Sequence, residues 1–181
     1  MTGSQGIRVG VVIAVALIAG FLVWFFVIRD SGDNGQFSGG EPTEISNSDS
    51  GVATLAGEAG HPVYWVGSRP GTKLEGTLLD NGNAYVRYLG TNAAIGDPEP
   101  NFLTIGTYPV PNAYSALKDA AKQPGAVVKQ APDNGLVVTN TSSPNSVYVA
   151  YRDQDLQIEV YDPNPRQARQ LATSGAVTPV D

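Results

Sequence analysis

The sequence predicts an α+β fold that follows a single membrane-spanning helix, and three observations support this prediction. Residues 9–28 form an uncharged apolar run, residues 30–48 are rich in Gly, Ser and acidic side chains, and the remainder alternates short β-type runs with turns. We therefore expect a stub at 1–6, a transmembrane helix at 7–29, a flexible tether at 30–48 and one α+β domain at 49–181. In that domain a mostly antiparallel sheet would carry its helices on one face.

The apolar run is long enough to cross a bilayer. Its 20 residues would extend about 30 Å as a helix, which matches the thickness of the hydrocarbon core. A cleaved signal peptide is the alternative, but its apolar core would be shorter and small residues would follow it. Here Phe25 and Phe26 lead directly into Arg29 and Asp30. We expect an uncleaved single-pass anchor, with the stub in the cytoplasm and the large C-terminal part outside it.

The segment 30–48 lacks the apolar side chains that folding requires. Only Phe37 and Ile45 interrupt its Gly, Ser and acidic residues, so burial could not offset the entropy lost on ordering. We therefore predict a disordered tether. From residue 49 onward, apolar residues recur at helical spacing, which predicts a short helix over 49–60 that opens the domain.

Eight short runs rich in Val, Ile, Tyr and Thr predict the strands of the sheet. Two of the turns between them are Asn81-Gly82 and Asn134-Gly135, residue types that tolerate the positive φ angles of tight hairpins. The expected strands are 62–67, 73–79, 83–89, 102–108, 126–130, 136–140, 146–151 and 156–161.

The register of the last hairpin follows from its alternating pattern. A loop at 152–155 would set Val149 opposite Ile158 on a consistent apolar face. The same register sets Tyr148 opposite Glu159 on the other face. We expect that second face to be amphipathic and partly solvated.

Two further helices are expected, at 112–123 and 163–173, because each has an apolar stripe and Pro or Gly at its ends. From residue 102 onward the element order is therefore strand, helix, four strands, helix. That order suits an antiparallel sheet with helices on one face, and it leaves open a small-ligand pocket between the sheet and a helix.

Composition excludes several classes of function. The chain has no cysteine, which excludes disulfides, thiolate catalysis and cysteine-ligated metal centres. Its formal net charge of −6 argues against a nucleic-acid partner, which would require a basic surface. The sequence carries no nucleophile motif and no phosphate-binding glycine loop. We therefore expect no cofactor, no metal and no catalytic residue.

Five residues are candidates for a binding site: His61, Tyr64, Trp65, Arg69 and Arg87. Aromatic side chains with arginine suit the binding of sugars, peptides or proteins. The alternative is that the aromatic side chains build the core. The single histidine has the chemistry of a general base or of a lone metal ligand. The alternative is that its ring makes a structural hydrogen bond at the entry to the first strand.

The domain resembles a set of membrane-anchored actinobacterial proteins that have no assigned activity. The motifs that carry the resemblance are HPVYWVG at 61–67, YVRYL at 85–89, YPVPNAY at 108–114, VY at 147–148 and EVYDP at 159–163. The resemblance covers roughly residues 50–180. It implies a bacterial domain placed outside the cytoplasm, and it implies no reaction.

These observations predict a non-catalytic interaction or sensing module at the cell membrane. Its partners would be the membrane itself and an envelope protein or small ligand that the sequence does not identify. A small-ligand-binding domain of the envelope is the alternative. An envelope hydrolase is a further alternative, and it would need His61 beside a serine or a carboxylate.

Overall fold

The computed structural model describes residues 40–181. The predicted stub, the predicted transmembrane helix at 7–29 and residues 30–39 of the predicted tether lie outside the described residues. None of the helices within 40–181 is both long and apolar enough to cross a membrane.

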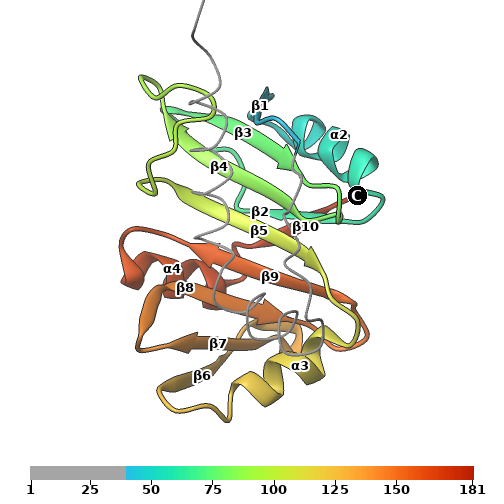
Figure 1. Cartoon of the computed structure of the whole chain (residues 1–181), viewed down its shortest axis with the longest axis vertical. Coiled ribbons are helices and arrows are strands. Elements are labelled where there is room, and N and C mark those ends of the chain that lie inside the picture. Colours follow the sequence, from blue (N-terminus) through green and yellow to red (C-terminus); the bar gives the residue numbers. More distant parts are fainter. Residues whose placement is uncertain (1–39) are drawn as a thin grey trace, which may run out of the picture.

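One eight-stranded sheet runs through the described part of the chain (Figure 1). All its neighbouring strands are antiparallel, which confirms the predicted α+β class and the mostly antiparallel sheet. Strands β1 and β6 form its two edges. In spatial order the strands are β1 (Thr43–Ile45), β3 (Thr72–Leu78), β4 (Ala84–Gly90), β5 (Leu103–Pro109), β9 (Leu156–Tyr161), β8 (Ser143–Ala150), β7 (Leu136–Asn140) and β6 (Ala126–Gln130).

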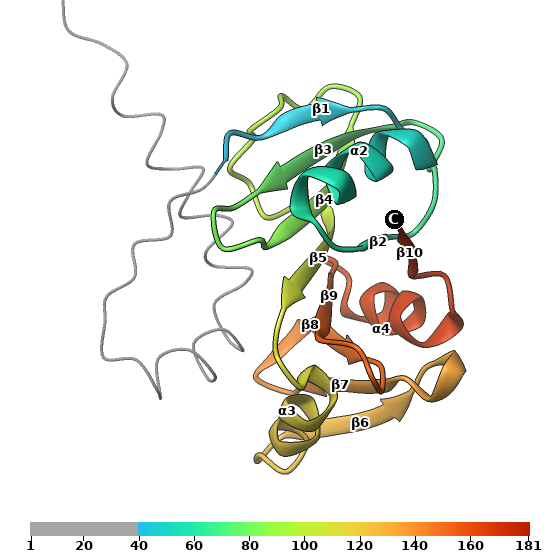
Figure 2. The ribbon, with the colours of Figure 1, turned by 90° about the vertical axis from the view of Figure 1, so that its right-hand side faces the viewer.

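The main hydrophobic core lies on one side of this sheet, which we call the first face. Helices α2 (Asp49–Ala59) and α4 (Pro165–Ser174) cover it, together with a small second sheet of β2 (Val63–Trp65) and β10 (Thr178–Val180) (Figure 2). Alternate strand residues such as Val86, Ile105 and Ile158 point into this core and are fully buried. The period-2 apolar pattern thus fixes which side of each strand carries the core.

Helix α3 (Ala113–Ala120) lies on the opposite side of the sheet, which we call the second face (Figure 1). Its Leu117 belongs to a separate cluster with Tyr148 and Ala150, whose neighbours Val147 and Val149 point into the main core. The prediction that all helices pack on one face is therefore wrong. The helix buries its stripe of Ala and Leu against small and aromatic residues of β7 and β8.

Both predicted Asn-Gly turns are confirmed as connections between antiparallel neighbours. Gly82 has φ 84° and closes the β3–β4 hairpin, with its N–H donated to the carbonyl of Leu79 at 2.9 Å. The β6–β7 connection contains the short 3₁₀ turn Pro132–Asn134, in which Asp133 and Asn134 take positive φ. Asn and Asp adopt this conformation at low steric cost, which explains their place in the turn.

The predicted register of the last hairpin is confirmed, because Val149 lies opposite Ile158 and Tyr148 opposite Glu159. The expectation of a partly solvated second face is wrong at this position, since Tyr148 is 4% exposed and Glu159 is 1% exposed. A buried carboxylate surrounded by tyrosines thus replaces the expected wet surface.

Strand β1 lies within the segment that the sequence assigned to the tether. Thr43 and Ile45 pair with Gly76 and Leu74 of β3, and the Asn47 side chain donates to the carbonyl of Thr72 at 3.0 Å. The methyl groups of Ile45 lie against Gly76, where an added Cβ would make a tight contact of 3.0 Å with Ile45 Cγ2. The ordered domain therefore begins before residue 49.

Candidate functional site

The aromatic pair of β2 lies in the main core. Tyr64 and Trp65 are both buried, and the backbone N–H of Tyr64 donates to the Thr107 hydroxyl at 3.0 Å. The Tyr64 hydroxyl donates to Gln154 at 2.8 Å, and burial raises its pKa to about 12. Both rings therefore contribute to packing on the first face.

Arg69 lies near the same core, with its guanidinium 5.9 Å from the centre of the Tyr88 ring. The Tyr88 hydroxyl accepts the N–H of Val66 at 2.9 Å and donates to the carbonyl of Gly67 at 3.2 Å. Burial raises the pKa of Tyr88 to about 12. This tyrosine thereby holds the end of β2 and the loop after it against the sheet.

His61 joins two loops at the start of β2. Its Nδ1 lies 2.8 Å from the carbonyl oxygen of Pro62, and its Nε2 lies 2.7 Å from the carbonyl oxygen of Gly82. The ring thus links the β3–β4 turn to the entry of β2. Both ring nitrogens are occupied by backbone contacts, which leaves neither free for a substrate in this arrangement.

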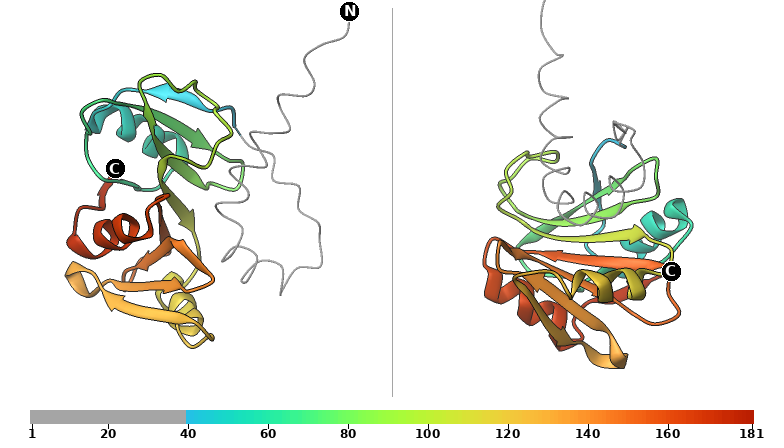
Figure 3. Two further views of the ribbon diagram at one scale, coloured as in Figure 1. Left: turned by 90° about the vertical axis from the view of Figure 1, so that its left-hand side faces the viewer. Right: turned by 60° about the horizontal axis from the view of Figure 1, so that its bottom comes forward.

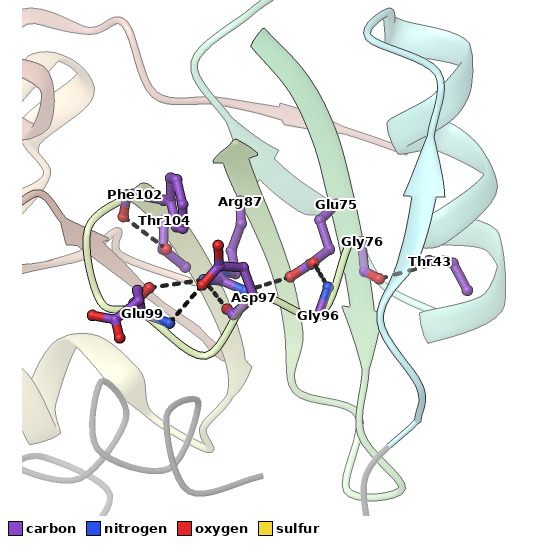
Figure 4. Close-up of polar contacts among 9 residues, drawn as sticks. All are labelled: Thr43, Glu75, Gly76, Arg87, Gly96, Asp97, Glu99, Phe102 and Thr104. Atoms are coloured by element: carbon purple, nitrogen blue, oxygen red, sulfur yellow. Dashed lines mark hydrogen bonds and ion pairs between the residues drawn. The ribbon is translucent and has the colours of Figure 1, made fainter. Parts of the chain in front are cut away.

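Arg87 lies on the second face, because its neighbours Val86 and Tyr88 point into the main core. Figure 4 shows its contacts with Glu75, Asp97 and Glu99. Its Nη1 donates to Glu75 at 2.6 Å, and both residues are buried. Its Nη2 donates to the carbonyl oxygens of Asp97 and Glu99, at 2.9 and 3.2 Å. The second oxygen of Glu75 accepts the N–H of Gly96 at 2.5 Å. The ion pair therefore fastens the loop 91–102 over this end of the sheet.

A second polar cluster lies on this face, and none of its residues was among the candidates predicted from the sequence. Tyr108 donates to Glu159 at 2.5 Å, and Tyr148 donates to the other carboxylate oxygen at 3.1 Å. Burial raises the pKa of Glu159 to about 7, and the bonds from hydroxyl groups offset only part of this effect. Tyr85 packs edge-on against Tyr108, with ring centres 5.7 Å apart.

Three more polar atoms are buried beside this cluster. The hydroxyls of Thr77 and Tyr85 and the side-chain carbonyl oxygen of Gln157 have no hydrogen-bond partner within 40–181. Thr77 lies opposite Tyr85, and Gln157 lies opposite Tyr108. A buried polar atom without a partner costs about 1–3 kcal/mol, which a bound hydroxylated molecule or water would relieve.

Strand β6 forms a free edge of the sheet, and it carries the most exposed large apolar side chains in the described part of the chain. Val127 is 40% exposed and Val128 is 49% exposed, and as successive strand residues they lie on opposite sides of the sheet. The sequence predicted the strand itself but not its place at an edge, because a pattern of alternating residues does not specify the order of strands. Exposed valines on a strand whose neighbours are mostly buried are the signal that identifies it.

The backbone groups along this edge follow from the pairing with β7. Thr141 donates its N–H to Gly125, and Ala131 donates its N–H to Gly135, so odd-numbered residues bond toward β7. The N–H and C=O groups of the even-numbered residues therefore point outward. These groups belong to Ala126, Val128 and Gln130. The N–H of Ala126 already donates to the carbonyl of Gln123.

Within 40–181, no three His, Asp or Glu side chains gather closely enough to hold a metal ion. No family model, curated protein or solved structure matches this chain.

Proposed function

We propose that this chain is a membrane-anchored module, placed outside the cytoplasm, which binds protein through the free edge of β6 and catalyses no reaction. The observation that carries the binding surface is the exposure of Val127 and Val128 beside backbone groups for which residues 40–181 supply no hydrogen-bond partner. An extended segment that adds to such an edge gains main-chain hydrogen bonds and covers apolar side chains in one step.

The position of this edge suits an anchored module. The described part of the chain begins at residue 40, just before β1, and β6 is at the opposite end of the eight-stranded sheet (Figure 3). A partner that adds to β6 thus approaches the end of the domain farthest from its attachment. Among the candidates predicted from the sequence, Tyr64, Trp65 and Arg87 are buried. Their burial favours a structural role for these three side chains and leaves partner binding to the edge of β6.

Photocrosslinking of the full-length protein in intact cells tests this proposal. A photoreactive residue at position 127 should yield specific adducts, whereas one at the exposed position 166 of α4 should yield none of the same mass. Val128→Pro should abolish the adducts, because proline lacks the outward N–H but leaves the bonds to β7 in place. Val128→Thr keeps the N–H and should retain them. Adducts that persist in the proline variant would contradict the proposal.

A small-ligand function is the second candidate, and the unpartnered atoms of Thr77, Tyr85 and Gln157 favour it. Their mixture of hydroxyl and carbonyl groups suits a hydroxyl-rich molecule. Glucose and glycerol should then raise the melting temperature of the full-length protein but not that of Tyr85→Phe. No shift with either compound, together with a higher melting temperature for Tyr85→Phe alone, would overturn this candidate.

A further inference from the structure

The outward groups of β6 lie at Val128 and on both sides of it. Val128 offers both an N–H and a C=O, Gln130 offers both on one side, and Ala126 offers a C=O on the other. A second β6 strand laid antiparallel about a two-fold axis at Val128 sets Ala126 opposite Gln130. The Val128 pair then exchanges two N–H···O bonds, and each Gln130 N–H finds an Ala126 carbonyl. These bonds use every outward group on this edge except the Gln130 carbonyls.

The side chains agree with the same register. The two Val128 side chains lie next to each other on the second face, and each covers part of the other's exposed surface. On the first face, Val127 lies opposite Lys129 of the second copy, whose aliphatic stem can cover it. No charged residue is placed directly opposite a like charge within β6.

The charges at the ends of the strand are complementary. Lys122 precedes β6 and Asp133 follows it, and both are exposed. Lys122 also pairs with the exposed Asp119 of its own chain at 2.7 Å, and Lys118 lies in the same helix, so this end of the strand carries two lysines and one acid. An antiparallel arrangement brings the start of one strand to the end of the other, so each Lys122 approaches an Asp133 of the second copy. Opposite charges at both ends favour this orientation over a parallel one.

We infer that the partner bound at β6 is a second copy of this chain, joined antiparallel about Val128 so that two sheets form one continuous sheet. This inference rests on the proposed function, because it names the partner of the same edge. A dimer of this kind has closed two-fold symmetry, in which one surface binds its own copy and no further strand edge of β6 remains. Attachment of both copies to one membrane raises their local concentration, which helps a short interface to form.

Cysteine crosslinking of the full-length protein in its membrane tests the inference, because the natural chain has no cysteine. Opposed residues of a hydrogen-bonded antiparallel pair have Cα atoms about 5.5 Å apart, within the range of a disulfide. Val128→Cys should therefore form a disulfide-linked dimer when the oxidant diamide is added. Ala126→Cys alone should not, since its two copies would be separated by more than about 13 Å along the strands.

The register gives a stricter control. Ala126→Cys and Gln130→Cys should each fail to crosslink alone and should crosslink when the two variants are expressed together. Adding Gln130→Pro to Val128→Cys should reduce the yield of dimer about tenfold, since two intermolecular hydrogen bonds are lost, whereas Gln130→Ala should not. Far-UV circular dichroism and melting temperature identify any variant that has failed to fold.

The outcomes separate this inference from the proposed function. A Val128→Cys dimer with the predicted register supports both. The absence of that dimer, together with adducts at position 127 to a different protein that Val128→Pro abolishes, overturns the inference and leaves the function standing. The absence of both the dimer and the adducts overturns both.

Discussion

Tyr108 donates its hydroxyl to Glu159 at 2.5 Å by reaching diagonally across the sheet over Gly106. Tyr108 itself is opposite Gln157, and Gly106 is opposite Glu159, so the ring occupies the space that a side chain at 106 would fill. A buried carboxylate is thereby held by two phenolic hydroxyls in the middle of the second face. This arrangement makes the stability of the domain depend on pH and on one glycine.

The pH dependence is testable with Glu159→Gln. Burial raises the pKa of Glu159 from 4.5 to about 7, so the folded state favours the protonated acid. This contribution is fully present below about pH 4.5 and is lost as the pH rises to about 7. At about 1.36 kcal/mol for each pH unit, the loss is roughly 3 kcal/mol.

Urea unfolding of the full-length protein at pH 4.5 and pH 8, followed by circular dichroism, measures this loss. The free energy of unfolding of the natural protein, relative to that of Glu159→Gln, should decrease between the two pH values. The same difference at both pH values would contradict the assigned role of Glu159.

Gly106→Ala should destabilise the domain by about 1–3 kcal/mol, because the added Cβ would lie 2.6 Å from Cζ of Tyr108. Thermal unfolding measures the effect. Gly57→Ala is the matched control, since nothing lies within 4 Å of a Cβ there and alanine favours the helix. Equal melting temperatures for the two variants would show that Tyr108 does not need the space.

Removing Arg87 alone from its buried pair with Glu75 should destabilise the domain more than replacing both residues by apolar ones. Arg87→Met should destabilise the domain by about 3–5 kcal/mol, because Glu75 is left buried without its partner. The double variant with Glu75→Leu should recover much of this loss. Hydrogen exchange at the Gly96 amide should accelerate in both variants, since that N–H bonds to Glu75 in a loop that Arg87 fastens.

The exposed pair of Lys122 and Asp119 provides a control for the buried pair. Asp119→Asn should leave the stability unchanged within error, because solvent screens the interaction of exposed charges. If Arg87→Met had an equally small effect, the buried pair would not hold the loop 91–102.

His61→Ala should lower the free energy of unfolding by about 1 kcal/mol, because the variant loses the hydrogen bond that the ring donates to a backbone carbonyl, that of Pro62 or of Gly82. Hydrogen exchange should increase at the amide of Gly82, which closes the β3–β4 turn. An unchanged exchange rate there would show that the ring does not link the turn to β2.

Local patterns in the sequence predicted most of the strands and turns. Asn81-Gly82 and the opposition of Val149 and Ile158 were correct because turn chemistry and period-2 alternation act over a few residues. Strand β1 was missed because Thr43–Ile45 is short and acquires order only from a distant edge of the sheet.

The sequence could not specify which face each helix covers. The apolar stripe of α3, with Leu117 at its centre, shows that one side is buried but does not identify the surface that buries it. The candidate site has the same limit. Alternation placed Tyr148 and Glu159 on the second face, but their burial depends on contacts between residues far apart in the sequence.

Hydrogen exchange at single residues of β6, in the full-length protein in its membrane, tests directly whether this edge binds a second copy of the chain. The amides of Val127 and Lys129 bond to β7 and serve as internal references. We expect the outward amides of Val128 and Gln130 to be protected when the protein is at its cellular density and to exchange quickly when it is diluted. Fast exchange of both outward amides at every density would contradict it.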